Sequence, residues 1–188
     1  MHAVAYPAHP EPFTIDDLYA LPDDGMRHEL IDGALLVSPP PANRHQLAVT
    51  RFLGLLLSAK PGEYEVLDGP GIRLSPDRLL QPDLIIGPRD ALTADVLYLD
   101  ARDVEAAIEV VSPSSIATDR ITKPALYAEA GIGIYIRVEQ IGPDAPTVYA
   151  YRLESGTYHL YTSAHAGQTL TLDKPFPFSF DPALLSAR

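Results

Sequence analysis

Two carboxylates stand in stretches that otherwise have the composition of buried strands. Glu109 lies inside the run AAIEVVS at residues 106–112, and Asp83 follows a proline at the start of DLIIGP. A buried carboxylate without a partner carries a large desolvation cost, so each one needs a cation, hydrogen bonds or a metal ion. Taken singly, Glu109 also fits a strand-end residue that faces solvent or an arginine, and Asp83 also fits a turn hydrogen bond.

Together, the two carboxylates predict a metal site. If their strands are neighbours, Asp83 and Glu109 lie on the same face within reach of one cation. Mg²⁺ prefers oxygen ligands and often uses one or two carboxylates, with waters and a substrate phosphate completing its shell. Mn²⁺ can substitute for it. A metal held in this way activates water and stabilises charge on a phosphate oxygen.

A lysine follows at a spacing that could bring it to the same place. Asp119, Lys123 and Tyr127 recur every four residues and therefore share one helical face. A lysine pointing back to the strand can hold the attacking water or the phosphate. The pair Asp119–Lys123 also fits a surface ion pair of little energetic weight. Pro124 favours a helix that begins at residue 124.

The composition narrows the class of protein. A chain of 188 residues with 46% hydrophobic residues predicts a single domain over 13–188, preceded by a flexible, proline-rich arm over 1–12. Without cysteine there are no disulfides or thiolate metal sites. We expect a cytoplasmic protein, because the sequence has neither a membrane-spanning apolar run nor a signal-peptide pattern. The formal charge of −11 argues against a general nucleic-acid coat protein, but it allows a local basic groove or an acidic site neutralised by metal.

The periodicity predicts an α/β or α+β fold. RHELIDGALLVSP indicates a hairpin that turns at Asp32–Gly33, and Asn43 is a candidate cap for a helix that runs to about Ala59. The Asp83 and Glu109 stretches are strands, followed by a helix to about residue 130 and the strand GIYIRVE. TVYAYRLESGTYHLYTS adds a C-terminal β-hairpin. We therefore expect a mixed β-sheet flanked by helices.

Four sequence pieces in a fixed order carry a family resemblance. RHELIDGALLVSPPP, QPDLIIGP, IEVVSPSS and D-x3-K-x3-Y-x3-G together resemble the putative restriction endonuclease family of the PD-(D/E)XK nuclease superfamily, from about Asp16 to Tyr161. The resemblance implies a restriction-endonuclease-like core and Mg²⁺-dependent hydrolysis of DNA phosphodiester bonds. It also implies that Asp83, Glu109 and the backbone carbonyl of Val110 bind the metal.

The sequence departs from the superfamily pattern at one position. Two residues after Glu109, where the superfamily has lysine, this chain has Val111. The family resemblance implies that the following helix supplies the lysine, which gives Lys123 the catalytic role. If Lys123 does not reach the site, a metal-binding remnant without activity is favoured. A second difference, Ile134 and Ile136 where relatives usually have Glu and Trp, concerns packing.

Two further residues fall at family positions. Glu29 of HELIDG matches an acidic residue of the family and is expected either to join the metal site with a catalytic role or to pair with Arg27 or Arg44. His45 at the helix start is more typical of a cap or a hydrogen-bond partner than of a base. A lone histidine without a second at ligand spacing argues against a zinc site.

The residues leave three functions open. The favoured one is a Mg²⁺-dependent DNA endonuclease, expected to be a homodimer because two active sites most simply cut both strands of a duplex. The alternative is a catalytically inactive nuclease-fold domain that binds nucleic acid or protein. The third is a metal-dependent hydrolase of a small phosphate ester, which would suit the acidic charge.

Overall fold

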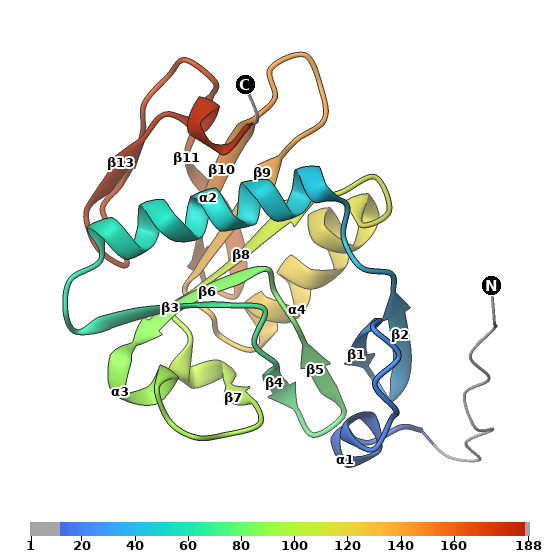
Figure 1. Ribbon diagram of the computed structural model, residues 1–188. Coiled ribbons are helices and arrows are strands. Elements are labelled where there is room, and N and C mark those ends of the chain that lie inside the picture. Colours follow the sequence, from blue (N-terminus) through green and yellow to red (C-terminus); the bar gives the residue numbers. More distant parts are fainter. Residues whose placement is uncertain (1–11, 187–188) are drawn as a thin grey trace.

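The computed structural model describes residues 12–186 and has a mixed sheet with helices on both faces (Figure 1). Apart from Pro12, the predicted arm lies outside the described residues. The main sheet has six strands in the order β11-β10-β9-β8-β6-β3. Its strands are β3 (Tyr64–Asp68), β6 (Leu84–Pro88), β8 (Ala106–Val111), β9 (Ile134–Glu139), β10 (Thr147–Glu154) and β11 (Thr157–His165).

The strands that carry the two predicted carboxylates are neighbours. β6 pairs antiparallel with β8, and Leu84 lies opposite Ile108. Asp83 comes directly before Leu84, so the register brings it beside Glu109. β8 then pairs parallel with β9, and the crossover between them consists of the π-helical turn η2 (Thr118–Thr122) and α4 (Lys123–Glu129). The predicted juxtaposition of the two strands is confirmed.

The two faces of this sheet bury different helices. α2 (Asn43–Ala59) packs against Ile108 and Val110 in one apolar core, and α4 packs against Ala107 in the other. Figure 1 shows α2 crossing one face of the sheet, with α4 on the opposite side. Because side chains alternate along a strand, Glu109 points to the α4 face.

A second sheet lies next to the start of β6. Its order is β2-β1-β5-β4-β7. β1 and β2 form the predicted hairpin, whose turn residues Asp32 and Gly33 have φ values of 51° and 72°, as a type I′ turn requires. The strands are β1 (Arg27–Ile31), β2 (Ala34–Ser38), β4 (Ile72–Ser75), β5 (Arg78–Leu80) and β7 (Leu99–Asp100). β5 leads directly to Asp83, which brings β1 alongside the carboxylates.

Short elements complete the chain. The predicted C-terminal hairpin is confirmed as β10 and β11, which pair antiparallel. The remaining elements are α1 (Ile15–Tyr19), α3 (Arg89–Leu92), η1 (Ala101–Asp103), β12 (Leu170–Leu172), β13 (Phe178–Phe180) and η3 (Pro182–Leu185). Within residues 12–186, no helix has the length and apolar character that crossing a membrane requires.

Two helix starts differ from expectation. The N-cap of α2 is Ala42, which makes no side-chain hydrogen bond, so the predicted cap at Asn43 is wrong and Asn43 is the first helical residue. α4 begins at Lys123, not at Pro124, and Lys123 has helical angles of φ −60° and ψ −47°. α4 continues directly from the π-helical turn, in which the N–H of Lys123 donates to the carbonyl of Thr118.

Candidate active site

A cavity of about 530 Å³ gathers most of the side chains that the sequence analysis singled out for chemistry. We call it the carboxylate cavity. It opens between the second sheet, the start of α2 and the turn η2. The ionisable side chains that line it are Arg27, Glu29, His45, Asp83, Glu109, Asp119 and Lys123.

Lys123 reaches the carboxylate on β8. Its Nζ lies 2.9 Å from Oε1 of Glu109, and the Tyr127 hydroxyl donates a hydrogen bond of 2.7 Å to the same oxygen. Both partners come from α4, at positions four residues apart that share a helical face. Among the described residues, no hydrogen bond ends on Oε2 of Glu109. The lysine that is missing at Val111 therefore has a counterpart on α4.

Glu29 holds the same lysine from the other side. Its Oε1 lies 3.1 Å from Nζ of Lys123 and also accepts a hydrogen bond of 2.8 Å from the backbone N–H of Gln81. The predicted pairing of Glu29 with Arg27 or Arg44 is wrong. The ammonium group is thus buried between two carboxylates on different elements, β1 and β8.

Asp83 has its own set of partners. Nη1 of Arg27 lies 3.1 Å from Oδ1, Nε2 of His45 lies 3.1 Å from Oδ2, and the N–H of Val110 donates a hydrogen bond of 2.8 Å to Oδ2. Burial acts to raise the pKa of Asp83, but His45, Arg27 and the Val110 N–H outweigh it and lower the pKa. Asp83 is therefore held as a carboxylate with a fixed orientation, directly against the backbone of β8.

Burial changes the acid–base behaviour of the other groups. It raises the pKa of Glu109 to about 8, against the lowering effect of Lys123, with Asp83 and Asp119 adding to the rise. Burial likewise raises the pKa of Asp119 to about 6. Desolvation acts to lower the pKa of Lys123, but the surrounding carboxylates outweigh it and raise that pKa. The cavity therefore contains more carboxyl groups than cationic side chains.

Asp83 and Glu109 are the adjoining carboxylates that could hold a cation, and the protein alone does not complete a metal shell around them. Four carboxylates line the cavity against two cationic side chains, which leaves a formal charge of −2 when His45 is neutral. Among residues 12–186, no group of three or more His, Asp or Glu side chains is arranged to hold a metal ion. Asp83 and Glu109 together supply the one or two carboxylates with which Mg²⁺ is often bound, and water and phosphate complete such a shell.

Three contacts were not foreseen from the sequence. The sequence places Tyr127 on the same helical face as Lys123 but predicts no partner for it. In the structure, the i, i+4 spacing brings both side chains to Glu109. Arg27 is one of two candidate partners of Glu29 in the sequence, but in the structure it contacts Asp83. Asp119 is only 3% exposed, so a surface ion pair with Lys123 is wrong. The hydroxyl of Tyr135 donates a hydrogen bond to the carbonyl of Asp119 and so secures the π-helical turn.

The rim of the cavity is made of proline and serine. Pro39, Pro40 and Pro41 follow β2 on one side, and Ser112, Ser114 and Ser115 follow β8 on the other. Oγ of Ser112 lies 3.1 Å from Oγ of Ser114 and 2.9 Å from Oγ of Ser115. Hydroxyl groups at the mouth can donate hydrogen bonds to phosphate oxygens.

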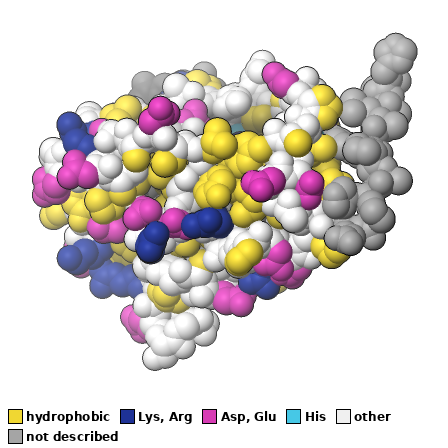
Figure 2. All heavy atoms as spheres, turned by 90° about the horizontal axis from the view of Figure 1, so that it is seen from below, with side chains coloured by type: hydrophobic (Ala, Val, Ile, Leu, Met, Phe, Trp, Pro, Cys, Tyr) yellow, Lys and Arg dark blue, Asp and Glu magenta, His cyan; other side chains and the backbone are white. Residues whose placement is uncertain are grey.

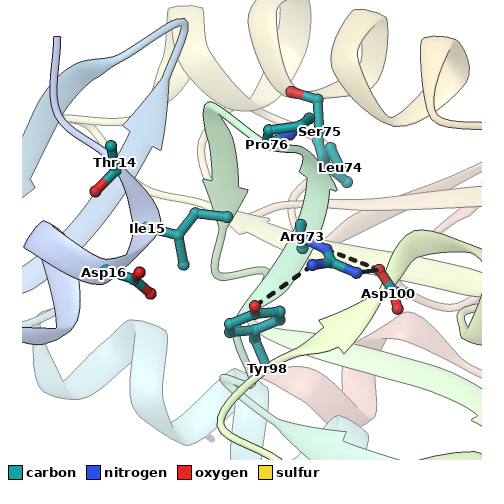
Figure 3. Close-up of a pocket in the computed structure, with 9 residues that line it drawn as sticks. All are labelled: Thr14, Ile15, Asp16, Arg73, Leu74, Ser75, Pro76, Tyr98 and Asp100. Carbon is teal, nitrogen blue, oxygen red and sulfur yellow. Dashed lines mark hydrogen bonds and ion pairs between the residues drawn. The ribbon is translucent and has the colours of Figure 1, made fainter.

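Another cavity of about 530 Å³ lies away from these carboxylates and has a different chemistry. Figure 3 shows Arg73 in it, bonded to Asp100 and to the hydroxyl of Tyr98. We call it the Arg73 cavity. The guanidinium group of Arg73 already donates a hydrogen bond of 2.8 Å to Asp100 and lies over the ring of Tyr98. The carboxylate cavity is therefore the better candidate for catalysis.

The fold is that of a restriction-endonuclease-like protein. A solved structure described as a putative nuclease belonging to DUF820, from Anabaena variabilis, matches with a TM-score of 0.65 and 20% identity, over 80% of this chain and 84% of that one. The family model Uma2, described as putative restriction endonuclease, matches residues 15–187. The chain belongs to this family, and the assignment supports a nuclease function. A search of curated proteins gave no significant match.

Proposed function

We propose that the protein is a Mg²⁺-dependent endonuclease that hydrolyses DNA phosphodiester bonds in the carboxylate cavity. The observation that carries this proposal is the 2.9 Å contact between Lys123 and Glu109. Glu109 lies on β8, which pairs with β6, and Asp83 directly precedes β6. Two carboxylates and a lysine at adjoining positions are the groups that metal-assisted phosphoryl transfer needs.

Asp83, Glu109 and the backbone carbonyl of Val110 would hold the metal. When bound, the metal supplies a nucleophilic water at neutral pH and neutralises charge on the phosphate. Lys123 orients the attacking water or stabilises the negative charge that develops on the phosphate. Glu29 fixes the position of the ammonium group, and Tyr127 fixes that of the Glu109 carboxylate.

The charge of the cavity supports the requirement for a cation. A phosphodiester brings a negative charge to a cavity whose formal charge is already −2, so substrate binding without a metal is electrostatically unfavourable. One divalent ion cancels the excess. Mn²⁺ takes the same oxygen ligands and is expected to substitute for Mg²⁺.

The ground for an inactive binding domain becomes weaker. That alternative rests on the acidic charge of the chain and on Val111 in place of the strand lysine. The amine of Lys123 contacts Glu109 from α4 instead, which weakens the second of these grounds. The hydrolase of a small phosphate ester differs from the endonuclease in one measurable respect. It would cleave a nucleotide or a monomeric diester and leave polymeric DNA intact.

The test is cleavage of duplex and single-stranded DNA in Mg²⁺ and in Mn²⁺. We expect metal-dependent cleavage by the wild type and its loss in Asp83→Asn. Asp100→Asn is the matched control, because Asp100 also pairs with an arginine but lines the Arg73 cavity. Full metal-dependent cleavage by Asp83→Asn would refute the assignment. Sedimentation of the protein with and without DNA tests the expected homodimer.

A further inference from the structure

A smaller cavity of about 280 Å³ shares a wall with the carboxylate cavity. The shared wall is the π-helical turn η2, in which Asp119 lines the carboxylate cavity and the next residue, Arg120, lines the smaller one. We call the smaller one the arginine–tyrosine cavity. Its walls are Arg120, Arg137, Glu139, the 141–145 segment, Thr147 and Tyr149.

The strand register aligns this cavity with the catalytic carboxylates. Glu109 on β8 is the Cα partner of Arg137 on β9, and Arg137 is the partner of Tyr149 on β10. Partners in adjacent strands point to the same face. Glu109, Arg137 and Tyr149 therefore form one row on the α4 face, and adjacent strands lie about 4.8 Å apart. The row spans roughly 10 Å, a separation that neighbouring nucleotides of one strand can bridge.

The guanidinium group of Arg137 is held in place and is incompletely satisfied. Its Cζ lies 5.1 Å from the ring centroid of Tyr149 and 5.4 Å from that of Tyr151. Nε lies 3.0 Å from Oε1 of Glu139, yet this buried atom forms no hydrogen bond with the described residues. The two tyrosine rings restrict the plane of the group. Because Nε is buried, a ligand in the cavity can reach only the terminal nitrogens of this side chain, which is 16% exposed.

Arg120 supplies a second guanidinium group at the mouth. It binds both oxygens of Glu139 at 2.8 Å, and its side chain is 41% exposed. Two arginines thus share one carboxylate, which leaves one positive charge among the three groups. Asp144 also lines the cavity and is exposed. With Asp144 counted, the arginine–tyrosine cavity has a formal charge of zero, against −2 for the carboxylate cavity.

The face of the molecule seen in Figure 2 has no broad basic patch. On the face seen in Figure 2, the Lys and Arg side chains lie in small groups among Asp and Glu side chains. With a formal charge of −11 for the chain, an anionic strand needs local cationic contacts next to the catalytic cavity.

We propose that the arginine–tyrosine cavity binds the phosphate next to the one that is cleaved. The inference rests on the proposed function and specifies how the polymer is held. The substrate strand runs from the carboxylate cavity past the turn η2, with its neighbouring phosphate on Arg137 and Arg120. Ile141, 44% exposed at the rim, and Tyr149 offer apolar surface to the adjoining sugar and base.

The test is equilibrium binding of a fluorescently labelled single-stranded DNA oligonucleotide in the Asp83→Asn background, which prevents cleavage. We expect Arg137→Gln to weaken binding by about three- to tenfold and to reduce the slope of log Kd against log salt by about one. The protein with Arg137 intact should bind an oligonucleotide with uncharged methylphosphonate linkages more weakly than one with phosphodiester linkages. Arg137→Gln should reduce the difference in affinity between the two oligonucleotides.

Arg152→Gln is the matched control. Arg152 also stacks over a tyrosine, with its Cζ 4.1 Å from the ring centroid of Tyr161, but it lines neither cavity. Equal affinity and equal salt slope for Arg137→Gln and Arg152→Gln would overturn the proposal, as would a protein that does not bind the oligonucleotide. If Arg137→Gln does not fold, Arg120→Gln carries the test, because this side chain is partly exposed.

Failure of the proposed function has a different signature. A wild type that cleaves no DNA in Mg²⁺ or Mn²⁺ refutes the nuclease assignment, while the binding comparison still reports on the arginine–tyrosine cavity. Cleavage by the wild type together with unaltered binding by Arg137→Gln refutes only the second phosphate site.

Discussion

The burial of Glu109 predicts that this carboxyl group destabilises the metal-free protein at neutral pH. The pKa of Glu109 in the folded protein, about 8, lies above its ordinary value of 4.5, mainly because of burial. The folded protein therefore binds this proton more tightly than the unfolded chain does. As the pH rises from 4.5 through 8, the free energy of unfolding falls.

The magnitude follows from the difference between the two pKa values. At about 1.4 kcal/mol for each pH unit above 4.5, keeping Glu109 in the cavity costs on the order of 3 kcal/mol at pH 7. Glu109→Gln removes the titrating group and keeps an oxygen for Lys123 and Tyr127. We therefore expect this variant to be more stable than the wild type by about that amount at pH 7, and to show little difference near pH 4.5.

Urea denaturation in the presence of a chelator, at pH 4.5, 6, 7 and 8, measures the effect. Glu154→Gln is the control, because Glu154 is exposed at the end of β10. Mg²⁺ should then stabilise the wild type and leave Glu109→Gln unchanged, because a ligand that binds only the folded state raises its stability. A Glu109→Gln variant that is less stable than the wild type by the same amount at every pH would refute the reasoning. It would instead identify Glu109 as a structural partner of Lys123.

Three further predictions concern the same cavity. Lys123→Met should lower kcat for DNA cleavage by about 100- to 1000-fold while calorimetric Mn²⁺ binding persists; loss of both would make Lys123 a structural residue. Tyr127→Phe removes a hydrogen bond to Glu109 and should lower the free energy of unfolding in urea by about 1–2 kcal/mol; an unchanged value would mean that this bond contributes nothing. Because the proton on Glu109 competes with the metal, Mn²⁺ affinity should rise as the pH approaches 8 and then level off, and a flat titration between pH 6 and 8 would contradict this.

The local signals in the sequence were sufficient to find the two strands with carboxylates. Alternation along AAIEVVS placed Glu109 on the face opposite Ile108, and the proline-bracketed DLIIGP run predicted β6. The Asp32–Gly33 pair predicted the hairpin, because its turn requires positive φ at both residues. These features depend on neighbouring residues, so a single sequence contains the information needed to predict them.

The ion pairs across the cavity could not be predicted from neighbouring residues in the sequence. Arg27 and Glu29 lie two residues apart on β1, which suggested a partnership, but they reach Asp83 and Lys123 from distant parts of the chain. The π-helical turn before Lys123 also has no sequence signature. Likewise, the stretches YEVLD and IRLS are close in sequence but join different sheets.

Calorimetric titration of Mn²⁺ into the wild type, Asp83→Asn, Glu109→Gln and the Glu154→Gln control tests the central claim most directly. We predict binding at one site in the wild type and the control, and its loss in Asp83→Asn and Glu109→Gln. Binding of equal affinity in all four proteins would place the metal elsewhere and would contradict a metal-dependent nuclease site in the carboxylate cavity.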